Sequence, residues 1–343
     1  MNSAEGEKCV LDLYDVTIIG GGPSGLYTAF YSGMRALKTK IIEAKSDLGG
    51  LVTHFYPKKT IYDVGGIPSI KGAQLIEHLN RQAETFHPAI ITGQTIVNME
   101  RLENQTFKLV ASNGAVHYSR RIILAVGSGI FEVNKLPLEE APLYENTSLF
   151  YAAGDPQRFA GKQVVISGGG NGALDWAAEL EPHCKRLTVI YRGDQFVHAL
   201  EHNVERLHTY QVDVKMSSEI VALSGTKGQL SSVTVCSSAS GCSETVAADA
   251  VIVNHGFQCS LGGLDDWGMT IDNSGICVDQ SMQTSVNGIY AIGNAASYPQ
   301  KLYLIAAGFV EGPIAVNSVK HDLEPEAPAQ AMVSTHHSFF NDK

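Results

Sequence analysis

Three glycines near the start of the chain, Gly20, Gly22 and Gly25, have the spacing G-x-G-x-x-G. A turn without side chains lets backbone N–H groups and a helix N-terminus approach the pyrophosphate of a dinucleotide. A β-branched strand at residues 14–19 precedes the turn, and a helical stretch to about Arg35 follows it. The order strand, glycine turn, helix predicts a nucleotide-binding βαβ unit.

Glu43 ends the next expected strand, roughly 20 residues after the glycine turn. A carboxylate at this place accepts hydrogen bonds from the ribose hydroxyls of an adenosine. Near the other end of the chain, residues 288–294 are expected to form a short strand and a turn. They open onto the last helix, from about Tyr303 to Lys320, which should pack back on the first unit. This second segment, or second arm of the site, favours FAD over NAD, because the flavin half of FAD is extended and its ribityl chain must be bound by a distant part of the chain. The helix would also place a positive dipole end at the isoalloxazine ring.

A second loop repeats the pattern as Gly168, Gly170 and Ala173, a variant tolerated in NADP sites. A strand at residues 163–167 precedes it. After the next strand, where an NAD site places an acid, the chain has Tyr191 and Arg192. The paired N–H donors of Arg192 suit a 2′-phosphate, so the sequence predicts NADPH, with NADH as an alternative. A solvated arginine without a ligand is the other interpretation.

Alternating strands and helices predict an α/β fold with parallel sheets. Two further strands, residues 121–126 and 250–253, end at glycine turns where we expect the chain to leave and re-enter the first domain. The expected architecture is two Rossmann-like, three-layer nucleotide-binding domains. Residues 12–127 and 258–343 would form the FAD domain, with the NAD(P) domain, residues 128–257, inserted into it.

The composition excludes several other classes of protein. A length of 343 residues predicts about two domains. Asp and Glu total 35 against 25 Lys and Arg, a net charge of −10, which disfavours nucleic acid as a partner. Apolar runs fall short of the ~20 residues that span a bilayer, and no secretory signal is evident, so a cytoplasmic location is expected. The six cysteines form no C-x-x-C pair and are expected to be reduced thiols.

In its order of motifs the chain resembles the ferredoxin–NADP reductases of the thioredoxin-reductase-like type, from about Asp12 onward. Besides the first glycine turn, the likeness is carried by residues 49–50, 56–57, 61–66, 159–162, 168–170, 175–177, 253–257, 266–268 and 304–309. The resemblance implies a homodimeric FAD and NADPH enzyme that passes electrons between NADPH and ferredoxin or flavodoxin. Thioredoxin reductase is excluded, because the place of its C-x-x-C, residues 151–155, reads Tyr-Ala-Ala-Gly-Asp and cannot exchange with a disulfide.

The resemblance also implies residues that touch the cofactors. One aromatic ring, here Tyr56, would stack on the flavin, and a C-terminal residue, His336 or His337, would cover the other face unless the tail is simply solvated. No catalytic acid, base or nucleophile is expected, because the chemistry belongs to the isoalloxazine, and no metal site is expected. The expected cofactor contacts are Gly20, Gly22, Pro23, Ser24, Gly25, Glu43, Gly50, Leu51, Tyr56, Val97, Gly127, Gly168, Gly170, Asn171, Gly172, Ala173, Arg192, Asn294 and Ala306.

The chain departs from the family at three places. Residues 171–172 are Asn-Gly where the family has an acid and a serine; Arg192 is followed by glycine, with Val197 or His198 at a later basic position; and Asn294 replaces an aspartate. FAD binding should survive, because an amide still hydrogen-bonds a ribityl hydroxyl. Loss of one arginine contact, ~1.5–3 kcal/mol, predicts roughly tenfold or more weaker discrimination for NADPH. The alternatives are an FAD electron-transfer protein with an impaired second site, fed by another donor, and a non-enzymatic flavin-binding protein.

An acidic ferredoxin would need a local basic patch on this acidic chain. The available cations near the first unit are Lys58, Lys59, Lys71, Arg35 and Lys38. If such a patch attracts ferredoxin electrostatically, the rate of electron transfer to ferredoxin should fall as salt rises.

Overall fold

The structure of the chain, a computed structural model, describes residues 12–152, 154–197 and 199–340. His198, the alternative basic position in the second unit, lies outside the described residues. Among the described residues, no helix is long and apolar enough to span a membrane.

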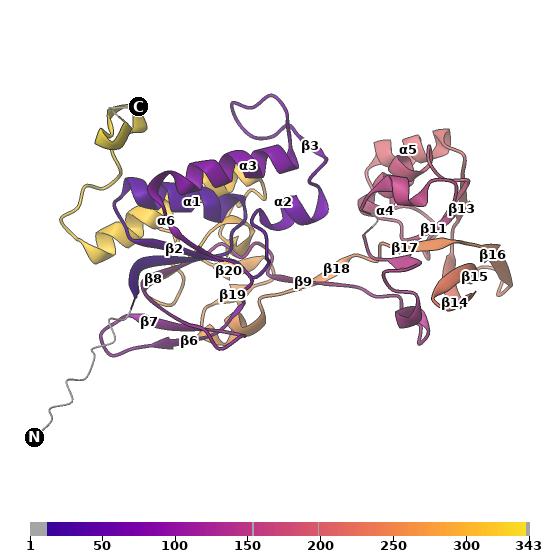
Figure 1. Ribbon diagram of the computed structural model, residues 1–343, viewed down its shortest axis with the longest axis horizontal. Helices are drawn as coiled ribbons and strands as arrows, with labels where there is room; N and C mark the ends of the chain where they lie inside the picture. The colour runs from indigo at the N-terminus through magenta and orange to yellow at the C-terminus, as the bar shows by residue number, and fades with distance from the viewer. Residues whose placement is uncertain (1–11, 153, 198, 341–343) are drawn as a thin grey trace, which may run out of the picture. The chain divides into compact units, whose positions relative to one another are not determined.

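Contacts divide the chain into two compact units. The first is Met1–Ile130 together with Cys259–Lys343, and the second is Phe131–Gln258. The chain passes between them along β9 (Ile130–Val133) and β18 (Phe257–Ser260), which pair with each other. Each unit has its own sheet and its own hydrophobic cores, so each is described by itself (Figure 1).

The first unit is built on one seven-stranded sheet in the order β5-β2-β1-β8-β7-β6, with β21 paired to β8. Four pairings are parallel: β5 with β2, β2 with β1, β1 with β8, and β8 with β21. The strand β7 pairs in antiparallel fashion with both β8 and β6. The strands are β1 (Leu13–Ile19), β2 (Thr39–Ile42), β5 (Ala89–Ile91), β6 (Ile96–Arg101), β7 (Phe107–Ala111), β8 (Val116–Leu124) and β21 (Ile289–Ala291).

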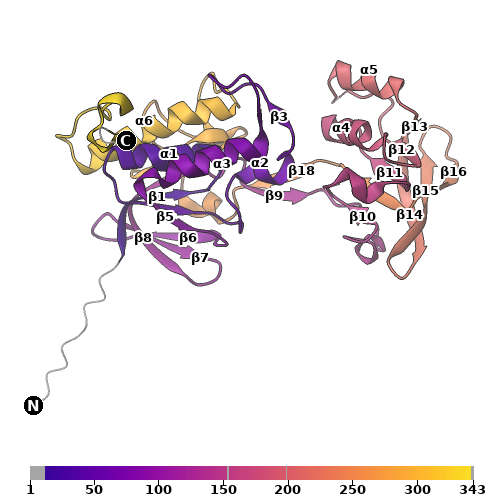
Figure 2. The ribbon, with the colours of Figure 1, turned by 45° about the horizontal axis from the view of Figure 1, so that its top comes forward.

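Three helices cover one face of this sheet, as Figures 1 and 2 show. Val16 and Ile123 face this helical layer, while their neighbours Ile19 and Ile122 face a second core that includes Phe107. The strands are therefore buried on both faces, which explains their unbroken β-branched runs. The helices are α1 (Pro23–Met34), α3 (Gly72–Ala83) and α6 (Ile305–Leu323).

The last helix, α6, returns to the first unit, as predicted from the sequence, and packs directly on α1. Gly308 and Gly312 let the two backbones approach. A Cβ at Gly308 would lie 2.0 Å from Ser24 Oγ, and one at Gly312 would lie 2.2 Å from Thr28 Oγ1. The helix α6 therefore contacts Ser24, the second residue of α1, which lies within the first glycine turn.

Shorter elements complete the first unit. The helix α2 (Gly50–Phe55) leads into the hairpin β3 (Thr60–Ile61) and β4 (Ile70–Lys71). A small sheet forms from β19 (Ile271–Asp272), β20 (Gly275–Cys277) and β22 (Ala296–Ser297). The 3-10 helices are η1 (Glu84–Phe86), η4 (Gly262–Trp267), η5 (Gly293–Ala295), η6 (Ser334–His336) and η7 (Ser338–Phe340).

The second unit has three layers around a five-stranded parallel sheet in the order β10-β17-β11-β12-β13. Ile166 packs with the helices on one face, and Val165 packs with a three-stranded antiparallel sheet on the other. Its elements are β10 (Leu149–Phe150), β11 (Gln163–Ser167), α4 (Asn171–Leu180), β12 (Arg186–Ile190), α5 (Glu201–Thr209), β13 (Val212–Lys215), β14 (Ser218–Thr226), β15 (Gln229–Ser237), β16 (Ser243–Ala247) and β17 (Ala250–Val253), with η2 (Ala141–Leu143) and η3 (Pro156–Phe159).

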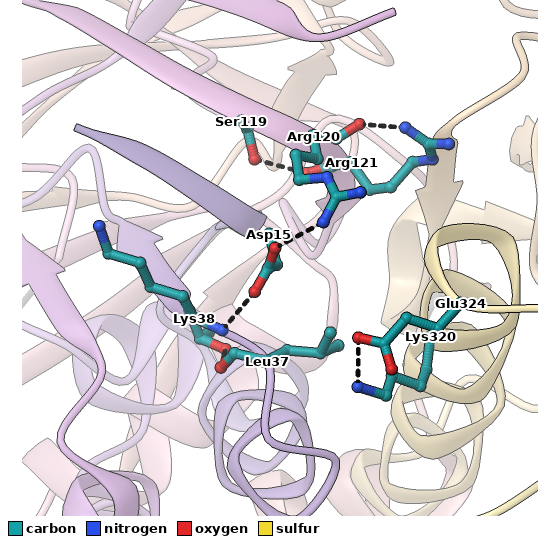
Figure 3. A network of polar contacts seen from close by, with 9 residues as sticks. Asp15, Leu37, Lys38, Ser119, Arg120, Arg121, Lys320 and Glu324 are labelled. Atoms are coloured by element: carbon teal, nitrogen blue, oxygen red, sulfur yellow. Dashed lines mark hydrogen bonds and ion pairs between the residues drawn. The ribbon is translucent and has the colours of Figure 1, made fainter. Parts of the chain in front are cut away.

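A polar network fixes the amino ends of the strands in the first unit (Figure 3). Asp15 accepts hydrogen bonds from Lys38 N at 2.9 Å and from Arg120 Nη1 at 3.1 Å. Arg121 pairs with Asp322, near the end of α6. The glycine turn follows the carboxyl end of β1, so this network lies at the opposite end of the strands and serves the scaffold.

Candidate dinucleotide sites

The three glycines of the first loop have three different surroundings. Gly20 has φ +110°, and a Cβ there would lie 2.3 Å from Ala125 O. A Cβ at Gly25 would lie 2.0 Å from Gly20 O, so this glycine lets helix and strand pack closely. Gly22 has φ −74° and open space, with its nearest neighbour, Gly50 Cα, 3.9 Å from an added Cβ. A tight turn, an open approach and a close packing contact are what a pyrophosphate loop requires.

The Glu43 carboxylate is buried and held in place beside this loop. Its Oε2 accepts a hydrogen bond from Gly21 N at 2.7 Å, and its Oε1 accepts one from Lys45 N at 2.9 Å. A carboxylate oxygen has two lone pairs, so both oxygens keep acceptor capacity for a ribose. The residues present therefore fit the adenosine half of FAD.

Two distant segments meet the start of α1. Pro23 opens the helix, where its missing N–H costs nothing. A Cβ at Gly293 would lie 2.8 Å from Ser24 Oγ, so Asn294, the next residue, is brought to this place from the far end of the chain. Ala306 lies in the first turn of α6, two residues before the Gly308 contact with Ser24.

The segment 49–51 also reaches the loop. Gly49 N donates a hydrogen bond to Gly21 O at 2.8 Å, and a Cβ at Gly50 would lie 3.2 Å from Gly22 Cα. Leu51 follows directly in α2. Gly127 lies two residues after Ala125, which backs Gly20, and has φ +63° with open space around it.

Of two further expected contacts, Tyr56 packs near α1, whereas Val97 lies at the edge of the sheet. Tyr56 ends α2 and packs, partly buried, against the core shared with α1. Burial, followed by the nearby Asp63 charge, raises the pKa of its hydroxyl. Val97 lies on β6, separated from β1 by β7 and β8, and its backbone oxygen packs on Gly263.

The C-terminal histidines lie elsewhere in this chain. His337 Nε2 lies 3.3 Å from Met34 O, and its ring meets Phe86 edge-on at 6.0 Å. His336 is exposed. Met34 ends α1, whose 12 residues span about 18 Å from Pro23. Within one chain the structure therefore does not bring the tail to the glycine loop.

The second loop repeats the design of the first. Gly168 has φ +148°, and a Cβ there would lie 2.3 Å from Asn254 O. Gly170 precedes α4 with φ −90° and no heavy atom within 4 Å of an added Cβ. Ala173, in the place of the third glycine, is fully buried in α4. The turn and the open approach to a pyrophosphate are both present.

An aromatic ring occupies the place that the acid holds in the first unit. A Cβ at Gly169 would lie 2.4 Å from the Tyr191 ring, just as Gly21 meets Glu43. The Tyr191 ring stacks on Phe196 at 5.4 Å with an interplanar angle of 12°. Arg192 follows, exposed. This site therefore offers a ribose an aromatic face and a guanidinium group instead of a carboxylate, which suits a 2′-phosphate.

Three further residues at this loop were not singled out as contacts from the sequence. Ser167 Oγ and His255 Nε2 lie 2.8 Å apart at the carboxyl ends of the adjacent strands β11 and β17. Burial and then the Arg192 charge lower the pKa of His255. The buried Asn254 Nδ2 has no partner among the described residues, while its Oδ1 lies 3.4 Å from an added Cβ at Gly172. An unpaired N–H donor beside the loop is available to a nucleotide.

Asn171 is engaged inside the unit. Its Oδ1 accepts hydrogen bonds from Leu200 N at 2.8 Å and from Asn203 Nδ2 at 3.2 Å. The side chain thereby ties the start of α4 to the start of α5.

Comparison with known proteins places the chain in a family. Residues 14–313 match the family described as pyridine nucleotide-disulphide oxidoreductase. Ferredoxin–NADP reductase 1 of Listeria monocytogenes is 47% identical over 329 residues, covering 96% of this chain and 98% of its own length. Ferredoxin–NADP reductase 1 of Bacillus velezensis is 48% identical over 326 residues, covering 95% and 97%. The chain belongs to the pyridine nucleotide-disulphide oxidoreductase family and is a flavin-dependent oxidoreductase. The resemblance found in the sequence is confirmed.

Solved structures confirm the fold class. Thioredoxin reductase of T. acidophilum aligns with a TM-score of 0.75 at 22% identity, covering 91% of this chain and 99% of its own. Bacillithiol disulfide reductase of Staphylococcus aureus aligns with a TM-score of 0.73 at 20% identity, covering 91% and 99%. These alignments establish the two-domain α/β architecture alone.

Four cysteines have surroundings that the structure describes. Cys184, Cys236, Cys242 and Cys277 are free thiols. Burial raises the pKa of Cys184 to about 11, so that thiol is a poor nucleophile near neutral pH. Among the described residues, no group of His, Cys, Asp or Glu is arranged to hold a metal ion.

Proposed function

We propose that this chain is an FAD-dependent oxidoreductase that passes electrons between NADPH and ferredoxin. The observation that carries the proposal is the pair of glycine loops with open space at Gly22 and Gly170. One loop is accompanied by a buried carboxylate, Glu43, and the other by Arg192. The first combination suits the adenosine of FAD, and the second suits a 2′-phosphate. The unit Phe131–Gln258 is then the NAD(P) domain and the remainder the FAD domain.

In this proposal the protein binds, orients and tunes, and does no acid–base work. Hydride acceptance and single-electron release are the chemistry that the isoalloxazine ring of FAD supplies when bound. Glu43 and the loop N–H groups would hold the adenosine and pyrophosphate, and Asn294 the ribityl chain. Tyr56 would stack on the ring. The N-terminus of α6 would place its positive dipole end nearby.

In the second unit, Gly170 and the N-terminus of α4 would receive the NADPH pyrophosphate. Arg192 would bind the 2′-phosphate, with His255 and Asn254 close to the same loop. Because Asn171 already bonds within the unit, it would contribute little to the nucleotide. That engagement favours the second candidate function, an FAD electron-transfer protein whose NAD(P)H site is impaired and whose electrons come from another donor.

Ferredoxin, or flavodoxin as the alternative carrier, would dock at the hairpin that follows Tyr56. Lys58 and Lys59 are exposed, and Lys71 pairs with Thr60 across the β3–β4 hairpin, so three cations share this small element. Of the two cations expected near the end of α1, Lys38 is exposed and pairs with Asp12, whereas the expectation for Arg35 is wrong. Arg35 is buried and donates to Pro328 O at 2.6 Å, at the far end of α1. Attraction between the three lysines of the hairpin and an acidic ferredoxin would make the rate of electron transfer to ferredoxin fall as salt rises.

A homodimer and a cytoplasmic location remain part of the proposal, supported by the family resemblance. Light scattering of the purified protein measures the first, and fractionation of the source cells measures the second.

The experiment is anaerobic mixing of the purified yellow protein with NADPH, and separately with NADH, while flavin absorbance is followed at about 450 nm. Rapid bleaching, faster with NADPH, supports the proposed function. Bound FAD that dithionite reduces but neither nucleotide bleaches supports the second candidate function. A protein that stays colourless after FAD is added refutes both.

A further inference from the structure

A buried ion pair lies at the second arm of the flavin site. Glu311 of α6 and Lys301, in the loop before α6, have side chains only 3% and 5% exposed, and they pair directly. Tyr298 Oη donates a further hydrogen bond to Glu311 Oε1 at 2.7 Å. Taking two charges out of water costs several kcal/mol per ion, and such pairs are weak contributors to stability. The pair therefore calls for a role other than stabilising the fold.

The other carboxylate oxygen holds the turn that carries Asn294. Gly293 N donates to Glu311 Oε2 at 2.6 Å. Gly293 has φ +64°, a left-handed conformation, and starts the 3-10 turn η5. The same residue lies against Ser24, in the first turn of α1. A charge-assisted hydrogen bond to a buried carboxylate is the strong kind, so it fixes where the turn sits relative to the first glycine loop.

We propose that Glu311 is a positioning residue of the FAD site, with Lys301 as its neutralising partner. It acts through Gly293 on the Asn294 amide, which would meet the ribityl chain. The inference rests on the proposed binding of FAD and goes beyond it, since neither residue is in the glycine loops. The pair also keeps the arm electrically neutral; removing either partner leaves one buried charge in the unit that holds the flavin.

The test uses Glu311→Gln, Lys301→Met and the double variant in the full-length protein. Glutamine keeps an acceptor for Gly293 but leaves Lys301 unpaired. Methionine leaves Glu311 unpaired, and the double variant is neutral and should fold even where a single variant is weak. The matched control is Glu324→Gln, directly after the last residue of the same helix, whose exposed carboxylate pairs with Lys320 (Figure 3). FAD affinity of each apoprotein, the flavin midpoint potential and thermal unfolding are measured.

We expect each single variant to bind FAD at least roughly tenfold more weakly than the wild type, with most of the loss restored in the double variant. We also expect the midpoint potential to rise in Glu311→Gln, where a positive charge remains, and to fall in Lys301→Met, where a negative one remains. Glu324→Gln should match the wild type in every measurement.

Two results overturn the inference. In the first, the single variants unfold at lower temperature, yet their folded apoproteins bind FAD with wild-type affinity and potential, which makes the pair merely structural. In the second, the double variant shows no recovery over either single variant. Failure of the wild type itself to bind FAD would instead refute the proposed function, so the two failures are distinguishable.

Discussion

Replacing Gly170 by alanine tests whether the second glycine loop holds the nucleotide, because the free protein has room for the added methyl group. Gly170 has φ −90°, which alanine adopts readily, and no heavy atom lies within 4 Å of the new Cβ. A glycine-to-alanine change at a compatible position stabilises a protein by about 0.4–1 kcal/mol through the unfolded state. The variant should therefore be at least as stable as the wild type.

The same methyl group would obstruct a pyrophosphate. Backbone N–H groups at the loop must approach phosphate oxygens to about 2.9 Å, whereas a methyl carbon keeps other heavy atoms at about 3.5–4.0 Å. Displacing the ligand enough to lose one hydrogen bond to a charged group removes ~1.5–3 kcal/mol. At ~1.4 kcal/mol per decade, the NADPH concentration for half-maximal flavin bleaching should rise roughly tenfold to a hundredfold.

Anaerobic stopped-flow mixing over a range of NADPH concentrations measures this change, and the flavin content and unfolding midpoint serve as controls. Gly22→Ala should do the converse, lowering flavin content without destabilising the apoprotein, since φ is −74° and the nearest atom is 3.9 Å away. Gly168→Ala should destabilise the unit, because its Cβ would lie 2.3 Å from Asn254 O. A Gly170→Ala enzyme that NADPH bleaches at wild-type concentrations would refute the assignment of this loop.

Four further variants test three single residues. Arg192→Ala should reduce the preference for NADPH over NADH roughly tenfold, the low end for a charge-assisted contact because the arginine is exposed; an unchanged ratio of bleaching rates would exclude it as the 2′-phosphate partner. Burial and Arg192 lower the pKa of His255 from its usual 6.5, so its stabilising contribution is present above that value and is lost as pH falls through the folded-state pKa. Because His255 also remains exposed to solvent, this contribution is small: His255→Gln should slightly flatten the decline in unfolding free energy between about pH 7 and 5 in urea titrations, and an identical slope would contradict this. Tyr56→Phe should preserve the bound-flavin spectrum, whereas Tyr56→Ser should alter it and weaken FAD binding roughly threefold to tenfold; equal spectra in all three proteins would rule out stacking.

The parts of the fold that depend on local sequence could be predicted. Strands expected at residues 163–167 and 250–253 are β11 and β17 with the same bounds, because β-branched runs and glycine turns specify strands locally. The last helix, expected from about Tyr303 to Lys320, is observed at Ile305–Leu323. The place of Glu43 beside the first glycine loop could be predicted, because its distance from the turn is fixed by the length of one helix.

Other features depend on contacts between distant segments and leave little trace in the sequence. Lys301 and Glu311 are an ordinary lysine and glutamate until the fold buries them together. The position of Tyr191 after β12 could be predicted, but its contact with Gly169 and its stacking on Phe196 could not. The antiparallel layer β14–β16 was not predicted, because the glycine loops specify βαβ units and carry no signal for this layer. The tail that carries His337 packs at Met34, a contact that no spacing predicts.

The discontinuity of the first unit has a consequence for synthesis on the ribosome. Translation proceeds from the N-terminus, so Phe131–Gln258 emerges complete while the first sheet still lacks β21 and α6. Until α6 is made, Ser24 has no Gly308 against it and Val16 faces no C-terminal helix. The nascent chain therefore carries a finished inserted unit beside an unfinished one, and FAD capture must follow release of the C-terminal helix from the exit tunnel.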